Sequence, residues 1–248
     1  MNKRDLVRLG VTLTVIFVLN IGDIVQLRRN VIDFEQNLGN DFSSIFSEML
    51  FGFHRLDTGL NIADLSQLAF LAVSPLFFGQ NISADLSISG TYFFTRQNDR
   101  ASWYIRRSLS LLLYSFMIAV FTCTLNTLMT EYFDVGSIPK ARVALVVCSV
   151  TLCLFILIML SNIVGIFFGS VISLAVTIVY AAMNMLLAAS PIKAVSIVAN
   201  CAFLKDESYT DMAVKLGING LIAAGLFVVG LVVIRKKELG LVNAEHLF

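Results

Sequence analysis

The segment from Ser87 to Arg107 combines aromatic side chains and arginines in a way that suits docking to an acidic surface. Three consecutive aromatic residues precede arginines that are spaced four apart, and Asp99 is the only acid. Aromatic rings provide rigid apolar contact area, and guanidinium groups make directional bonds to carboxylates. The candidate docking residues are Tyr92, Phe93, Phe94, Arg96, Asp99 and Arg100. The alternative is that the basic residues of this segment only fix the orientation of a membrane protein.

The rest of the chain carries none of the common catalytic or metal-binding motifs. The phosphate-binding loop, the G-x-S-x-G elbow, H-E-x-x-H and C-x-x-C are all absent. The two histidines, His54 and His246, are expected on opposite sides of a membrane, and the four cysteines lie in or near apolar runs. We therefore expect no catalytic residue, no metal site and no cofactor in this chain, and no nucleic-acid partner.

The composition indicates that the elements positioning this segment are membrane-spanning helices. Hydrophobic residues make up 57% of the chain and charged residues 14%, with a mean hydropathy of +0.83. A soluble domain has about 25% charged residues, and a spanning helix needs about 20 apolar residues. We expect an all-α, polytopic membrane protein that forms a single transmembrane domain. The six expected spans cover about 9–27, 65–84, 108–130, 143–163, 168–190 and 214–234.

One uncharged run is too long for a single crossing. Val143 to Ile192 contains 50 residues without a charge, which would make about 75 Å of helix. Two helices joined by a tight turn fit this length. The break is expected between Asn162 and Gly169, where one Asn and two glycines loosen the helix.

The charge distribution predicts that both termini lie in the cytoplasm. With six spans, ten of the 18 Lys and Arg residues fall on the N-terminal side of the membrane, together with five of the 17 acids. The opposite side then holds eight cations and twelve acids. Cytoplasmic segments are enriched in Lys and Arg, so the basic segment 85–107 is assigned to the cytoplasm. Interface anchors are expected at its end: Trp103, Tyr104, Arg106 and Arg107.

Two segments on the outer side are long enough to have structure. The segment 30–62 has apolar residues at helical spacing, which predicts an amphipathic helix on the membrane surface. It either seals the bundle or forms an outer gate. The segment 191–212 starts apolar and ends polar, and we expect it to dip into the membrane and return. The possible outer-gate residues are Phe34, Leu38, Phe42 and Phe53.

The stretch from Asp85 to Arg100 resembles a segment of ABC-2-type transporter permeases. That family tends to have an acid at the end of span two, a Ser-Gly-Thr-like turn, a short apolar helix and arginines about four apart. Here Asp85, Ser89-Gly90-Thr91, the three aromatics, Arg96 and Arg100 stand in those places. The chain is also similar in layout to the small permeases of Gram-positive peptide-export and bacteriocin-immunity systems. It departs from many ABC-2 permeases in its long outer segment after the first span.

The resemblance implies a function and a set of partners. The short cytoplasmic helix would be the coupling helix of an ABC exporter in a bacterial cytoplasmic membrane. It would dock on a separate ATPase subunit, which binds ATP and Mg. A second copy or a sister permease would complete the path, membrane lipids would surround it, and the cargo would be an amphipathic peptide or lipid-like molecule. The alternative is a membrane immunity or sensor protein that binds a peptide without pumping it.

Overall fold

The computed structural model describes residues 3–34, 62–86, 100–132, 140–188, 195–201 and 208–236. In these ranges the chain is helical and contains no strand, which confirms the expected all-α class. Apolar residues dominate every long helix, so each can bury one side against its neighbours. The elements are α1 (Lys3–Phe34), α3 (Ile62–Phe78), α5 (Arg100–Tyr132), α6 (Lys140–Phe168), α7 (Ser170–Ala188), the short 3-10 helix η3 (Ala199–Cys201) and α8 (Tyr209–Lys236).

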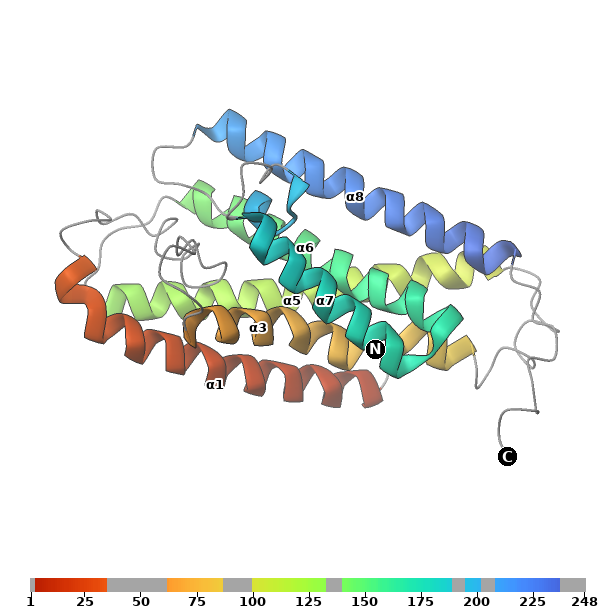
Figure 1. Cartoon of the computed structure of the whole chain (residues 1–248), viewed down its shortest axis with the longest axis horizontal. Coiled ribbons are helices and arrows are strands. Elements are labelled where there is room, and N and C mark those ends of the chain that lie inside the picture. Colours follow the sequence, from red (N-terminus) through yellow and green to blue (C-terminus); the bar gives the residue numbers. More distant parts are fainter. Residues whose placement is uncertain are drawn as a thin grey trace.

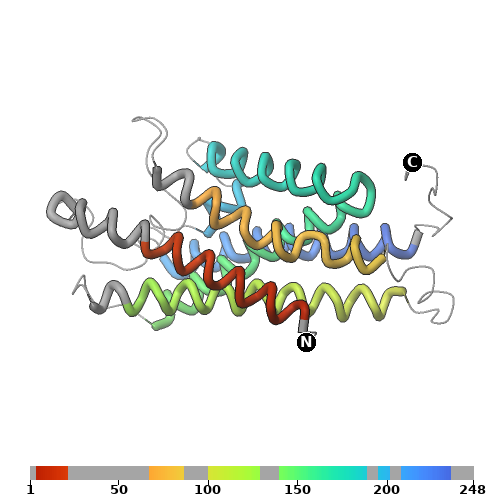
Figure 2. Tube along the Cα trace, turned by 90° about the horizontal axis from the view of Figure 1, so that it is seen from below, coloured from red at the N-terminus to blue at the C-terminus, as the bar shows by residue number. Residues whose placement is uncertain are grey.

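The long helices lie roughly along one axis and alternate in direction (Figure 1). α6 occupies the middle and packs against α3, α5, α7 and α8, whereas α1 contacts α3 and α5. The view from below shows α1 between α3 and α5 (Figure 2). The ends of α3 and α8 and the starts of α1 and α5 all point toward the same end of the bundle (Figure 1).

The 50-residue uncharged run contains two helices, and Gly169 separates them. α6 ends at Phe168 and α7 begins at Ser170, and Gly169 has a φ of 80°. Glycine adopts this left-handed conformation at little cost because it has no Cβ. The break therefore lies at the last residue of the expected interval, and Asn162 belongs to the interior of α6 rather than to the turn.

Four helices in the described part are long and apolar enough to cross a membrane, namely the stretches Arg100–Leu128, Lys140–Phe168, Ser170–Ala188 and Tyr209–Arg235. The two faces of α7 are arranged as a lipid-facing helix requires. In water the apolar face would be buried, but here small and polar residues pack inward and apolar residues face outward. The buried residues are Ser173, Thr177, Ala181, Asn184 and Ala188. The exposed ones are Val171, Ile172, Val176, Val179, Met183 and Leu186.

The helix α5 starts eight residues before the apolar run that predicted it. Arg100 to Arg107 form its first two turns, although the sequence placed them in the cytoplasmic segment 85–107. Partners on other helices stabilise this polar start of α5. In α5, Arg107 and Tyr104 find such partners on neighbouring helices.

In the segment between α7 and α8, residues 196–201 are buried, whereas Val195 and Ser208 are exposed. The expected dip of this segment into the membrane stays a prediction. Ser196 donates a hydrogen bond to the Asn184 carbonyl (2.7 Å), and the Ile197 N–H donates to Asn184 Oδ1 (2.9 Å). From α8, Asn219 Nδ2 donates to the Ile197 carbonyl (3.0 Å). These two asparagines satisfy backbone groups that no helix pairs, which an apolar environment requires.

Candidate functional site: the joint between α3 and α5

The helix α3 is interrupted just before the basic segment. It ends at Phe78, turns at Gly79 and Gln80, and continues as a short helical stretch over 81–86. Gly79 N donates to the Pro75 carbonyl at 2.7 Å. A Cβ at Gly79 would collide with that carbonyl and with the Ser161 side chain, so only glycine allows this approach to α6. We call residues 79–86 the joint.

Asn162 of α6 binds both sides of the interruption. Its Oδ1 accepts from the Ile82 N–H at 2.8 Å, and its Nδ2 donates to the Phe78 carbonyl at 3.0 Å. The side chain is fully buried. Backbone groups that lose their helical partners inside an apolar bundle are costly unless another group pairs with them. A single amide therefore stabilises the break and ties the joint to the central helix.

The joint also lies against the turn between α6 and α7. Gln80 Nε2 donates to the Ser170 carbonyl at 3.4 Å. A Cβ built on Gly165 would lie 3.2 Å from Ser83 Oγ, so the backbone of α6 approaches the joint closely here.

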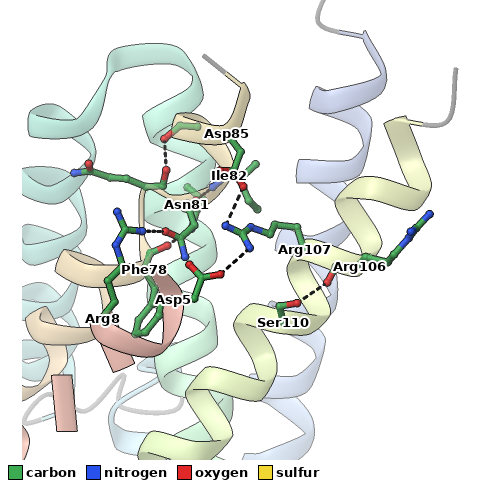
Figure 3. A network of polar contacts seen from close by, with 12 residues as sticks. Asp5, Arg8, Phe78, Asn81, Ile82, Asp85, Arg106, Arg107 and Ser110 are labelled. Atoms are coloured by element: carbon green, nitrogen blue, oxygen red, sulfur yellow. Dashed lines mark hydrogen bonds and ion pairs between the residues drawn. The ribbon is translucent and has the colours of Figure 1, made fainter. Parts of the chain in front are cut away.

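An ionic network connects the joint to α1 and α5 (Figure 3). Arg107 Nη1 lies 3.2 Å from Asp5 Oδ2, and Arg107 Nη2 lies 2.9 Å from Asp85 Oδ2. Tyr114 also donates a hydrogen bond to Asp5, at 3.3 Å. Asp5 is buried and Asp85 is partly exposed. One guanidinium thus joins the first turn of α1 to the end of the joint.

Arg8 forms a second link between α1 and the joint by donating a hydrogen bond to Asn81 Oδ1. Partial burial lowers the pKa of Arg8, and Arg4 lowers it further, while Asp5 raises it. The guanidinium remains protonated at neutral pH because the ordinary pKa of arginine lies far above neutrality. The joint therefore has direct contacts with α1, α5, α6 and α7.

Two of the expected interface anchors have partners on other helices. Tyr104 is fully buried, donates to the Phe227 carbonyl at 3.2 Å and fits against Gly230 of α8, which leaves room for the ring. Arg107 is partly buried and bridges two carboxylates. The anchoring role of both residues at the membrane interface stays a prediction.

Some of the remaining candidate residues lie within the described ranges, and the others lie outside them. Trp103 is partly buried, Arg106 is exposed and Arg100 is the first residue of α5. Phe34 is the last residue of α1, and its side chain is not described. The following candidates lie outside the described residues: Leu38, Phe42, Phe53, Tyr92, Phe93, Phe94, Arg96 and Asp99.

Sequence reasoning did not single out Asp5, Arg8, Asn81 or the bridging role of Asn162. The sequence did contain a signal for Asp5. This acid lies among the mostly basic residues expected on the cytoplasmic side, where it is expected to pair with a cation. No comparable signal marks Asn162, since asparagines occur in several of the apolar runs.

The chain belongs to the DUF2705 family, described as "Protein of unknown function", whose pattern matches residues 13–237. This match extends from α1 to the end of α8 and includes the joint, Asn162 and Arg107. Asp5 and Arg8 precede it. No curated protein and no solved structure matches the chain.

Proposed function

We propose that this chain is the membrane-spanning permease subunit of an ABC exporter of the ABC-2 type. A separate subunit hydrolyses ATP with Mg, and the permease moves an amphipathic peptide or lipid-like molecule outward. The observation that carries the proposal is the joint, because one short stretch beside the basic segment contacts four helices.

The contacts of the joint suit a mechanical relay. Asn162, Arg107 and Arg8 bind the joint to α6, α5 and α1 respectively. A force applied to the segment 87–99 would reach Asp85 first and then these helices. The hydrogen bonds of the joint and the close approach of Gly79 to α6 would transmit such a displacement directly to these helices. Segment 87–99, with its aromatics and Arg96, is the proposed contact with the ATPase.

The proposal includes six spans with both termini in the cytoplasm of a bacterial cell. The start of α1 and the end of α8 point toward the same end of the bundle, which supports an even number of crossings (Figure 1). In addition to the four stretches given above, α1 is uncharged from Leu9 to Gly22, and α3 from Leu65 onward. The positive-inside rule then puts the joint on the cytoplasmic side, where an ATPase can reach it.

The polar side chains buried between the apolar helices support an amphipathic cargo. Buried Ser, Thr and Asn side chains occur in every long helix, whereas Asp5 is the one Asp, Glu, Lys or Arg residue that is buried among the described side chains. Carriers driven by protons or sodium usually place ionisable groups within their spans. A second copy or a sister permease completes the path in this proposal.

The docking test uses affinity-tagged full-length chain extracted from its native membrane. Wild type should retain ATP-binding subunits that mass spectrometry identifies, and the double variant Arg96→Glu/Arg100→Glu should lose most of them. The matched control is Arg28→Glu/Arg29→Glu, which reverses two arginines expected on the outer side. It should retain the partner.

Two outcomes would count against the proposal. Undiminished retention of the ATPase by the Arg96/Arg100 variant would remove the docking role of the segment. A wild-type chain that captures no ATP-binding protein but binds a peptide would favour the immunity or sensor alternative.

A further inference from the structure

The exposed face of α5 changes from polar to apolar along its length. At its start, Arg106 Nη2 donates to Ser102 Oγ at 3.1 Å, and Ser110 Oγ bonds to the Arg106 carbonyl at 3.0 Å. Residues four apart lie on the same side of a helix, so these three form one polar patch. Farther along the same face the exposed residues are Leu109, Leu113, Met117 and Val120.

Arg106 differs from its neighbour Arg107 in its electrostatic environment. Arg107 is neutralised by Asp5 and Asp85. Arg106 points away from that network (Figure 3) and forms no ion pair with any carboxylate among the described side chains. The exposed guanidinium therefore has room for an external anion, and the partly buried Trp103 lies one turn away.

The length of the apolar face matches one leaflet of a bilayer. From Leu109 to Val120 the helix rises by about 16 Å, which is close to half of the ~30 Å hydrocarbon core. A phosphate at Arg106 would thus leave the attached acyl chain beside Leu113 and Met117.

We propose that this face of α5 binds an anionic phospholipid of the cytoplasmic leaflet. The phosphate bonds to Arg106, and an acyl chain packs along the apolar residues. A second copy of the chain fits this face poorly, because two-fold symmetry would bring Arg106 toward the partner's equivalent positive charge.

The test measures lipid preference on purified full-length chain in detergent, using fluorescent phosphatidylglycerol and phosphatidylcholine. Wild type should prefer phosphatidylglycerol. Arg106→Gln should reduce that preference about fivefold, the effect of about one basic residue at an anionic surface. Arg106→Lys should retain part of it because the charge remains. The matched control, Arg235→Gln, removes an exposed arginine from α8 and should leave the preference unchanged.

Several results would overturn the proposal. One is the absence of a phosphatidylglycerol preference in wild type, and another is an equal loss in both glutamine variants, which would indicate only general charge attraction. Displacement of the lipid by millimolar inorganic phosphate would show a phosphate site without a lipid role. Loss of an oligomer in Arg106→Gln, with unchanged lipid preference, would identify the face as an interface between copies.

Discussion

At the scale of single residues, Asn162 and Arg107 do the most to position the joint. Asn162 pairs with one backbone donor and one backbone acceptor that lose their helical partners at the break in α3, and Arg107 forms ion pairs with two carboxylates. Their role is to hold 79–86 in one position relative to α1, α5 and α6.

Asn162→Leu should destabilise the protein. Leucine has a similar size but leaves the Ile82 N–H and the Phe78 carbonyl without partners, and each orphaned buried group costs about 1–3 kcal/mol. The measurement is the midpoint of thermal unfolding in detergent. The control is Asn20→Leu, since the buried Asn20 donates to the Ile16 carbonyl of its own helix. An equal or smaller loss for Asn162→Leu than for Asn20→Leu would contradict the bridging role.

At the scale of elements, the contact between α5 and α8 depends on a glycine notch. The Tyr104 hydroxyl occupies the space where a Cβ of Gly230 would stand, and the Tyr104 and Phe227 rings lie 5.5 Å apart. Gly225, five residues earlier on α8, faces open space. The two glycines therefore allow a matched comparison on one helix.

Gly230→Ala should lower the unfolding midpoint because the added methyl group collides with Tyr104. Overpacking of this kind costs about 1–3 kcal/mol. Gly225→Ala should be neutral or stabilising, since alanine favours a helix over glycine. Combining Gly230→Ala with Tyr104→Phe should recover part of the loss by removing the hydroxyl. If the two alanine variants behave alike, the notch does not determine how α5 packs on α8.

Some of the helix boundaries were predictable from the sequence and others were not. Gly169 and the length of the uncharged run predicted the turn between α6 and α7, because local chemistry determines such a break. The start of α5 and the interior positions of Tyr104 and Arg107 were not predictable. They depend on Gly230, Asp5 and Asp85, which are distant in the sequence and become neighbours only when the helices pack.

At the scale of the whole molecule, the joint lies where α1, α5, α6 and α7 meet. A push on the adjacent segment 87–99 would therefore act on several helices at once. The candidate docking residues were chosen from their types and spacing. The contacts of the joint could not be inferred in that way. Asn162, Arg8 and Asp5 are distant from it in the sequence and come close to it only in the folded chain.

The most direct test of the relay measures whether nucleotide moves the helices. Spin labels at two exposed positions, Val11 on α1 and Val179 on α7, report their separation in the permease–ATPase complex by pulsed electron paramagnetic resonance. We predict that ATP with Mg shifts this distance in wild type. In Asp85→Asn, which weakens the link to Arg107, ATPase binding should persist while the shift shrinks. An unchanged distance in wild type, or the same shift in Asp85→Asn, would contradict the account.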